Sequence, residues 1–363
     1  MLEKLRQLVE LESPSNDKAA VDRTATLVEG WCAELGGRVK RHKQREYGDL
    51  LEVRFGPVRA KQKPLMLLGH LDTVWQVGTL KTMPWREDKK KIYGPGVYDM
   101  KAGVLMALTA IAALQDCKAL QTPVLLLLVS EEEIGSPVSR AVTERLARGC
   151  SAAFVLEPAQ GAQGAYKTAR KGVGDYMLRV RGVAAHSGVD FKKGHSAVLE
   201  LMRLLAKVEK FTDLKRGLTV NPGVIGGGTR SNVIAAEAWA EVDVRIVRAG
   251  DAARVEKMFR RLRCTDRNCT LEVSGGMNRP PMERTAEIAK LFKRARKIAA
   301  EMGFKLEEAA TGGGSDGNFT AAVGTPTLDG MGPVGEGAHA AHESLVKSSL
   351  VERTVLLARM LLA

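Results

Sequence analysis

The stretch "PLMLLGHLDTVW" (residues 64–75) joins an apolar run directly to a histidine and an aspartate. The apolar part, 64–69, shows no alternation of polar and apolar residues, which is typical of a strand covered on both faces of a parallel sheet. His70 and Asp72 follow at the point where such a strand should end. The pair forms either a metal-binding corner or a polar turn, and other strand ends are needed to distinguish the two.

Two further apolar runs have the same texture, "PVLLLLVS" (123–130) and "AAFVLEP" (152–158). Between the first run and "PVLLLLVS" lies "AGVLMALTAIAALQ" (102–115), a segment of small residues with helical periodicity. This is a strand–helix–strand order, in which the crossover helix covers the sheet. We therefore expect an α/β domain with a mostly parallel mixed sheet and helices on both faces.

From about residue 171 the pattern changes to alternating strands and amphipathic helices. The order is strand, helix, strand, strand, helix, strand, over residues 174–187, 195–211, 218–228, 232–247, 251–263 and 270–276. This order is that of a split β-α-β, or ferredoxin-like, α+β domain. We expect such a domain at 171–276, inserted into a first domain made of 1–170 and 277–363. A chain of 363 residues is long enough for two domains.

Composition excludes several functional classes. The net charge is +13, but the basic residues form no long blocks and only 5% of residues are aromatic, so we expect no nucleic-acid partner. Such a charge can steer small anionic substrates. No uninterrupted apolar run reaches the roughly 18 to 20 residues of a membrane span, and the first residues do not resemble a signal peptide. Five scattered cysteines favour a reducing compartment, and we expect a cytoplasmic protein.

Acidic and imidazole side chains follow the predicted strands of the first domain. In open parallel sheets, ligands collect at the carboxyl ends of the strands. The residues found there are His70, Asp72, Asp99, Glu131, Glu132, Glu133, Glu157, His339 and His342. Taken singly, each has an ordinary structural explanation: a turn histidine, a helix cap at Asp99, or a solvated helix start at the three glutamates.

Taken together, these side chains favour a metal site. Several carboxylates in one cleft repel each other unless cations neutralise them. Imidazole and carboxylate ligands without thiolates suit Zn²⁺, and Co²⁺ or Mn²⁺ accept the same atoms. Two histidines and three carboxylates suit two ions that share a bridging ligand, about 3.5 to 4 Å apart. Cys264 and Cys269 lack neighbouring soft ligands, so they are a weak second candidate.

Eight motifs carry a resemblance that covers the whole chain in order: "GHLDTV", "GPGVYDMKAG", "SEEEIGS", "LEP", "AAHSG", "GGTRSNVIAAEAWAEVDVR", "GGGSDGNF" and "GPVGEGAHAAHE". The sequence resembles the zinc-dependent aminoacylase, carboxypeptidase and deacylase metallopeptidase superfamily, most of all its bacterial glutamate carboxypeptidases of the G type. The resemblance implies a catalytic metal-binding domain, an inserted dimerisation or lid domain, a homodimer, and two Zn²⁺ ions per subunit.

The resemblance also implies a ligand set, which is His70, Asp99, Glu133, Glu157 and His339. Asp99 would bridge the ions, Glu157 would complete the first site and His339 the second. His342 stands where relatives commonly carry Asn or Asp, so it is left out of the set.

Two residues beside the ligands have implied catalytic roles. Asp72 would orient the imidazole of His70. In "SEEEIGS", Glu132 would be the general base and Glu133 the ligand, which leaves Glu131 in a place often held by aspartate. The implied mechanism is metal-assisted amide hydrolysis, in which Glu132 takes a proton from water and returns it to the leaving amine.

The inserted domain carries the implied substrate contacts. His186 would reach the partner subunit's cleft and stabilise the oxyanion, while Asn232 and Arg245 would hold the substrate, Arg245 through its free carboxylate. Gly313 and Gly314 would line the pocket with backbone groups. The alternative for Arg245 is a structural ion pair on a strand.

These observations predict a carboxypeptidase-like hydrolase that releases a C-terminal amino acid from a small peptide or N-acyl amino acid. An N-acyl-amino-acid deacylase of the acetylornithine or succinyl-diaminopimelate type, or a dipeptidase, is the alternative. A serine hydrolase is a third reading, because "GGSDG" (313–317) fits the nucleophile pattern around Ser315, with Asp329 and His339 following. The segment before Ser315 is polar rather than a buried strand. A non-catalytic binding protein would lack a ligand or the base, and neither is missing.

Overall fold

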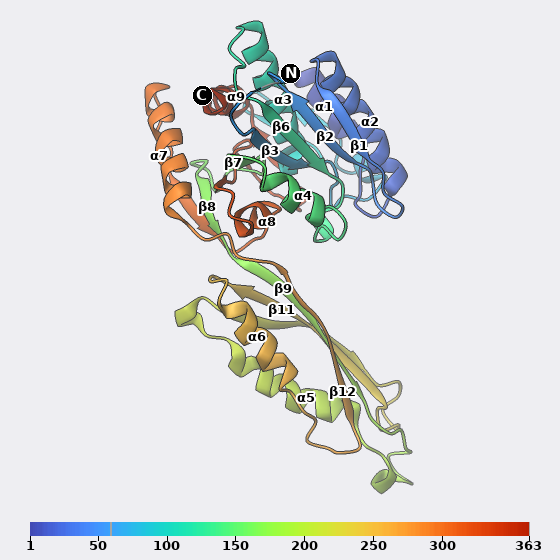
Figure 1. The fold of residues 1–363 in the computed structure, drawn as a ribbon. Helices are drawn as coiled ribbons and strands as arrows, with labels where there is room; N and C mark the ends of the chain where they lie inside the picture. The colour runs from blue at the N-terminus through green and yellow to red at the C-terminus, as the bar shows by residue number, and fades with distance from the viewer. Residues whose placement is uncertain (59, 363) are drawn as a thin grey trace. The chain divides into compact units, whose positions relative to one another are not determined.

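The computed structural model describes residues 1–58 and 60–362, which form two compact units (Figure 1). Unit 1 comprises Met1–Ala169, Arg284–Thr311 and Ser315–Ala363, and unit 2 comprises Arg170–Glu283 with Gly312–Gly314. The boundary expected at residue 276 lies inside a strand of unit 2, β12 (Thr270–Arg279). Unit 2 extends further because Met282 and Arg170 exchange backbone hydrogen bonds beyond the end of that strand.

The main sheet of unit 1 has the strand order β1-β2-β6-β3-β7-β14. The strands are β1 Arg38–His42, β2 Leu50–Phe55, β3 Leu65–His70, β6 Val124–Val129, β7 Ala152–Val155 and β14 Thr327–Leu328. β6, β3, β7 and β14 run parallel, whereas β1 and β2 add an antiparallel edge. Every residue of β3, β6 and β7 is buried, as their continuous apolar sequences predict. The predicted fold class is confirmed.

Helices cover both faces of this sheet (Figure 1). On one face, side chains of β3, β6 and β7 pack with α4 (Arg140–Ala147), and α8 (Gly317–Ala322) contacts α4 and β7. The other face carries α3 (Ala102–Asp116), which packs on β3 and against α9 (Lys347–Leu361). A Cβ at Gly103 would lie 2.1 Å from the carbonyl oxygen of Leu156, so glycine allows α3 to approach the end of β7.

Shorter elements complete unit 1. The helices are α1 Leu2–Glu10, α2 Lys18–Glu34 and α7 Ala286–Glu301. A small sheet joins β15 Gly335–Glu336, β16 Ser344–Val346, β5 Lys91–Tyr93 and β4 Arg86–Glu87, and a two-stranded sheet pairs β13 Glu308–Thr311 with β8 Tyr166–Arg170.

One helical segment, Val97–Asp116, is long and apolar enough by composition to cross a membrane, although it contains Asp99 and Lys101. Most of its most apolar stretch, 78%, is buried inside the protein. The segment ends in α3, which packs on the main sheet, and a core helix of a soluble globular protein has the same composition.

Unit 2 is a four-stranded antiparallel sheet with two helices on one face (Figure 1). The strand order is β10-β11-β9-β12, with β9 Gly172–Arg181, β10 Thr219–Gly227 and β11 Glu237–Ile246 beside β12. Helices α5 (Ala197–Val208) and α6 (Asp251–Arg260) bury one apolar core against these strands. The chain order and the sheet order are those of a ferredoxin-like fold.

The cysteines provide a test of this packing. Cys117 is exposed, whereas Cys32 in α2 and Cys150 after α4 are buried. Burial raises the pKa of the Cys32 thiol to about 12 and that of Cys150 to about 11. Because the thiolate is the reactive form, both thiols should stay protonated and inert at pH 8, while Cys117 reacts quickly.

Thiol labelling of the native protein, followed by mass spectrometry of its peptides, measures this difference. Labelling in denaturant should reach all five cysteines, and a Cys117→Ser variant should lose the fast phase assigned to Cys117. Modification of Cys32 at the rate of Cys117 in the folded chain would show that α2 does not pack as described.

Candidate metal centre

Five segments of unit 1 bring acidic and imidazole side chains together at one edge of the main sheet. β3 ends at His70, and Asp99 lies in the irregular turn Val97–Lys101 that precedes α3. Glu133 is in the short 3₁₀ turn Glu132–Ile134 after β6. Glu157 follows β7 by two residues, and His339 lies between β15 and β16. Parallel strands place their carboxyl ends at the same edge, so segments far apart in sequence meet there.

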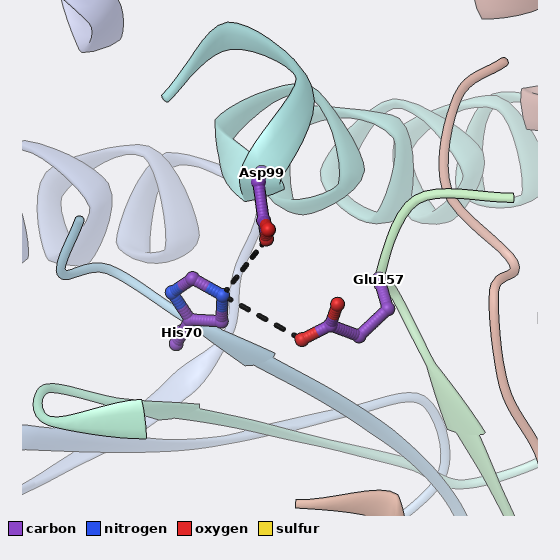
Figure 2. Close-up of side chains that lie close together, drawn as sticks. All are labelled: His70, Asp99 and Glu157. Atoms are coloured by element: carbon purple, nitrogen blue, oxygen red, sulfur yellow. Dashed lines mark ion pairs between the residues drawn. The ribbon is translucent and has the colours of Figure 1, made fainter. Parts of the chain in front are cut away.

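The first cluster consists of His70, Asp99 and Glu157. The Nε2 atom of His70 lies 3.3 Å from Oδ1 of Asp99 and 3.6 Å from Oε1 of Glu157. Figure 2 shows these two contacts leaving one ring nitrogen of His70 toward the two carboxylates. One ligand atom from each residue lies within 4.8 Å of the others, which is the spacing needed to hold one metal ion.

The second cluster consists of Asp99, Glu133 and His339. The Nε2 atom of His339 lies 3.1 Å from Oε2 of Glu133 and 3.5 Å from Oδ2 of Asp99. Asp99 thus belongs to both clusters, with Oδ1 toward His70 and Oδ2 toward His339. A carboxylate used in this way is the natural bridge between two metal ions.

Several buried polar atoms of these clusters have no hydrogen-bond partner in the part of the chain that the structure describes and are free to bind a metal ion. Among the described residues, Nε2 of His70, Oδ1 of Asp99 and Oε1 of Glu133 are buried without a hydrogen-bond partner. Buried polar atoms without partners are costly, and a cation would satisfy all three. The donor set of imidazole nitrogens and carboxylate oxygens suits Zn²⁺ and similar divalent ions.

The pKa values of these side chains support the same conclusion. Contacts with the carboxylates of Asp99 and Glu133 raise the pKa of His339 to about 10. Burial, together with the charge of Asp99, raises the pKa of Glu133 to about 7. For Asp99 burial raises the pKa, but the imidazoles of His339 and His70 outweigh it, so that its pKa lies below the ordinary value. The carboxylates thus favour positive charge beside them, and a divalent ion would supply it in place of protons.

Asp72 supports two parts of the centre. Nδ1 of His70 lies 2.9 Å from the backbone oxygen of Asp72 and 3.5 Å from its carboxylate, so this residue fixes the ring. The carboxylate also accepts hydrogen bonds from Ser15 Oγ at 2.6 Å and from the backbone N–H groups of Glu132 and Glu133, each at 3.2 Å. The sequence predicts the first role but does not reveal the second.

Glu131 does not behave as a solvated residue at a helix start. Its side chain is fully buried and accepts hydrogen bonds from the hydroxyl of Ser130 and the backbone N–H groups of Val138 and Ser139. These bonds close the loop that carries Glu132 and Glu133. Sequence reasoning missed this role, because a run of three glutamates gives no sign of which one points inward.

Asp99 does not cap α3, because the residue at the N-cap position is Lys101 and no side chain there accepts a capping hydrogen bond. The turn that carries Asp99 is held instead by the buried carboxylate of Glu343. Glu343 was absent from the predicted site. The neighbouring His342 is exposed and belongs to neither metal cluster.

The other predicted site residues lie in unit 2. His186 forms a backbone bridge with Val233, and the N–H of Ser187 donates to the carbonyl of Asn232 at 3.0 Å, so the segments of His186 and Asn232 are neighbours. The Nδ1 atom of His186 accepts a hydrogen bond from the backbone N–H of Gly188 at 3.1 Å.

Arg245 and the glycine turn form a second group in unit 2. The guanidinium of Arg245 contacts both carboxylate oxygens of Asp243, the shortest distance being 2.7 Å, so the ion pair considered as an alternative is present. Gly313 and Gly314 accept hydrogen bonds from Arg170 through their carbonyl oxygens, at 3.2 and 3.0 Å.

Comparison with known proteins identifies the family. Residues 66–363 match peptidase family M20/M25/M40, and the chain belongs to that family. It is therefore a metallopeptidase-type hydrolase, as the sequence motifs predicted.

Relatives and solved structures agree with this assignment. Carboxypeptidase G2 of Pseudomonas sp. (strain RS-16) is 26% identical over 371 residues, covering all of this chain and 88% of the relative. A probable carboxypeptidase of Arthroderma otae is 34% identical over 240 residues, 60% of this chain and 51% of the relative. The M20 family metallo-carboxypeptidase of Sulfolobus solfataricus shares the fold, with a TM-score of 0.80, 18% identity, and coverage of 99% of this chain and 98% of that one.

The shared position of Asp99 predicts how metal binding responds to substitution. Asp99→Asn removes the negative charge that both clusters share, whereas Glu157→Gln changes only the first cluster. After dialysis against metal-free buffer, we expect about two equivalents of metal in the unmodified chain. Glu157→Gln should lose one equivalent and Asp99→Asn both, measured by elemental analysis.

Asp190 is a partly exposed aspartate of unit 2 that pairs with Lys193, and the Asp190→Asn control should retain the full metal content. An Asp99→Asn protein that keeps one ion at unchanged affinity would show that the two clusters do not share this residue.

Proposed function

We propose that this chain is a di-zinc carboxypeptidase, which cleaves an amide or peptide bond and releases a C-terminal amino acid. The observation that carries the proposal is the pair of ligand clusters joined through Asp99, with Glu132 directly beside the ligand Glu133. The similarity to Carboxypeptidase G2, which extends over this whole chain, supports a substrate with a C-terminal amino acid.

The proposed ligands divide between two ions, with Zn²⁺ as the expected metal and Co²⁺ or Mn²⁺ suited to the same atoms. His70 and Glu157 would hold the first ion, Glu133 and His339 the second, and Asp99 both. When bound, such ions acidify a water molecule and polarise the scissile carbonyl group.

Glu132 is the proposed general base. Its backbone N–H is held by the carboxylate of Asp72, and the next residue is a proposed ligand, which supports a place for Glu132 beside the proposed metal centre. Glu132 would take a proton from the attacking water and then give it to the nitrogen of the leaving amine. Asp72, by holding both His70 and the peptide of Glu132, would couple the base to the first cluster.

Unit 2 supplies the proposed substrate contacts. His186 would stabilise the oxyanion in the cleft of a partner subunit, which requires a homodimer, and Asn232, Gly313 and Gly314 would contact the substrate. Arg245 would bind the free carboxylate of the substrate in a bidentate manner. For this role, the guanidinium would have to exchange its present contacts with Asp243 for the carboxylate of the substrate.

A deacylase or a dipeptidase would use the same ligands, so the choice among these depends on substrate tests. The geometry does not favour a serine hydrolase. The hydroxyl of Ser315 is fully buried and donates to the carboxylate of Asp329 at 2.5 Å. His339, the imidazole that such a triad would need, contacts Asp99 and Glu133 instead.

Substitution of Glu132 tests the proposed base. Glu132→Gln keeps the size of the side chain but cannot accept a proton, so kcat should fall by about 10²- to 10⁴-fold while two equivalents of metal remain bound. Release of free amino acid from a panel of N-acyl amino acids and dipeptides, before and after chelation, provides the measurement. A fully metallated variant with substantial kcat would rule out Glu132 as the base, and activity that survives chelation would argue against a metal mechanism.

Substitution of Arg245 tests the substrate class. Arg245→Ala should raise KM about 10- to 100-fold for substrates with a free carboxylate, with a smaller change in kcat, since a charge-assisted bidentate contact is lost. The same substrates with an amidated C-terminus give the control, because the variant should treat them as the unmodified enzyme does. Equal effects on both substrate forms would assign Arg245 a structural role only.

A further inference from the structure

Glu343 is a buried acid whose carboxylate is fully used by hydrogen bonds. It directly precedes β16, and only 1% of its surface is exposed. Its Oε1 atom accepts from the backbone N–H groups of Tyr98 at 2.9 Å and Asp99 at 3.0 Å. Its Oε2 atom accepts from the backbone N–H of Gly96 at 2.9 Å and from the indole Nε1 of Trp75 at 2.7 Å.

These four donors belong to segments that carry proposed metal ligands. Trp75 follows His70 by five residues, and Gly96 and Tyr98 belong to the turn that carries Asp99. Glu343 itself follows His339 by four residues. One carboxylate therefore ties together three of the five chain segments that form the metal centre.

We propose that Glu343 is the positioning residue for both metal ions, acting through the shared ligand Asp99. This inference rests on the proposed di-metal site and adds a residue to it. By accepting hydrogen bonds from the backbone N–H groups of Tyr98 and Asp99, Glu343 fixes the main chain from which the Asp99 side chain extends. Both oxygens of that side chain then reach their respective clusters.

Chemistry explains why a carboxylate is needed at this position. An ionised carboxylate is an acceptor only, with room for about four hydrogen bonds, and here it meets four donors. A glutamine would direct an NH₂ group at two of those N–H donors. With its acceptor sites occupied, Glu343 is not a ligand, and it belongs to neither cluster.

The turn has little freedom to compensate for a lost acceptor. Gly96 has a φ of 71°, and a Cβ there would lie 2.5 Å from Cγ2 of Thr73 in the loop after β3. The turn is thus packed directly on the segment that follows His70. Without the bonds to Glu343, the N–H groups of Gly96, Tyr98 and Asp99 would lose their acceptor, and any shift of the turn that restored hydrogen bonds would displace Asp99.

Metal affinity of Glu343→Gln is the decisive measurement. Competition with a chromogenic chelator gives the Zn²⁺ affinity of each site, and the absorption spectrum of the Co²⁺ form reports ligand geometry. We expect both affinities to fall together by about 10- to 100-fold, with an altered Co²⁺ spectrum. A change in one site alone, as expected for Glu157→Gln, would overturn the proposal.

Unit 2 offers a matched control. Glu200 is also fully buried, and its carboxylate accepts from the backbone N–H groups of Thr265 and Asp266. Glu200→Gln should lower the melting temperature and leave both metal affinities and the Co²⁺ spectrum unchanged. A Glu343→Gln protein that behaves like this control would show that Glu343 has a structural role only.

Two milder variants keep the test valid if Glu343→Gln does not fold. Trp75→Phe removes one donor and preserves the three backbone bonds, and Glu343→Asp keeps the charge on a shorter side chain. Each should weaken both sites by a smaller factor than Glu343→Gln. Unchanged affinity in both folded variants would overturn the inference.

Failure of the proposed carboxypeptidase activity can be distinguished from failure of the role proposed for Glu343. If the unmodified chain binds two ions and does not hydrolyse peptides, the role of Glu343 is still measured from the affinities. If the unmodified chain binds fewer than two ions, the di-metal site and the role of Glu343 built on it are both refuted.

Discussion

Two imidazoles, those of His70 and His339, approach opposite oxygens of one carboxylate, that of Asp99. Around this contact lie further carboxylates in a buried setting, where like charges cannot coexist without cations. This contact therefore constrains three parts of the chain. β3 must end at His70, and α3 must start just after Asp99. The C-terminal part of the chain must bring His339 to the same edge of the sheet.

Three buried acids outside the ligand set enforce that constraint. Glu131 closes the loop before Glu133, Asp72 holds the peptides of Glu132 and Glu133, and Glu343 holds the turn of Asp99. All three act on backbone N–H groups. A carboxylate that holds the main chain fixes the position of the Cα atom that carries the neighbouring side chain. This restrains that side chain more firmly than a contact between two flexible side chains would.

The sequence predicts the sheet and the convergence of side chains because both follow from simple regularities. Continuous apolar runs mark buried parallel strands, and polar residues after them meet at one edge, as His70 and Glu157 do. The role of Glu343 could not be predicted in this way, because three of its four partners are backbone groups more than 240 positions away. The pairing of Arg245 with Asp243 was foreseen only as an alternative, since strand neighbours two residues apart suit either role.

The insertion of unit 2 between the parts of unit 1 also orders events during synthesis. The first cluster is complete once residue 157 has been made, whereas the second waits for His339, 182 residues later. At usual ribosomal rates that interval lasts roughly 10 to 40 s. Throughout it, the nascent chain has one incomplete ligand set and no Glu343 to hold Asp99. Formation of the proposed two-ion site would therefore be a late event, coupled to the docking of the last part of the chain.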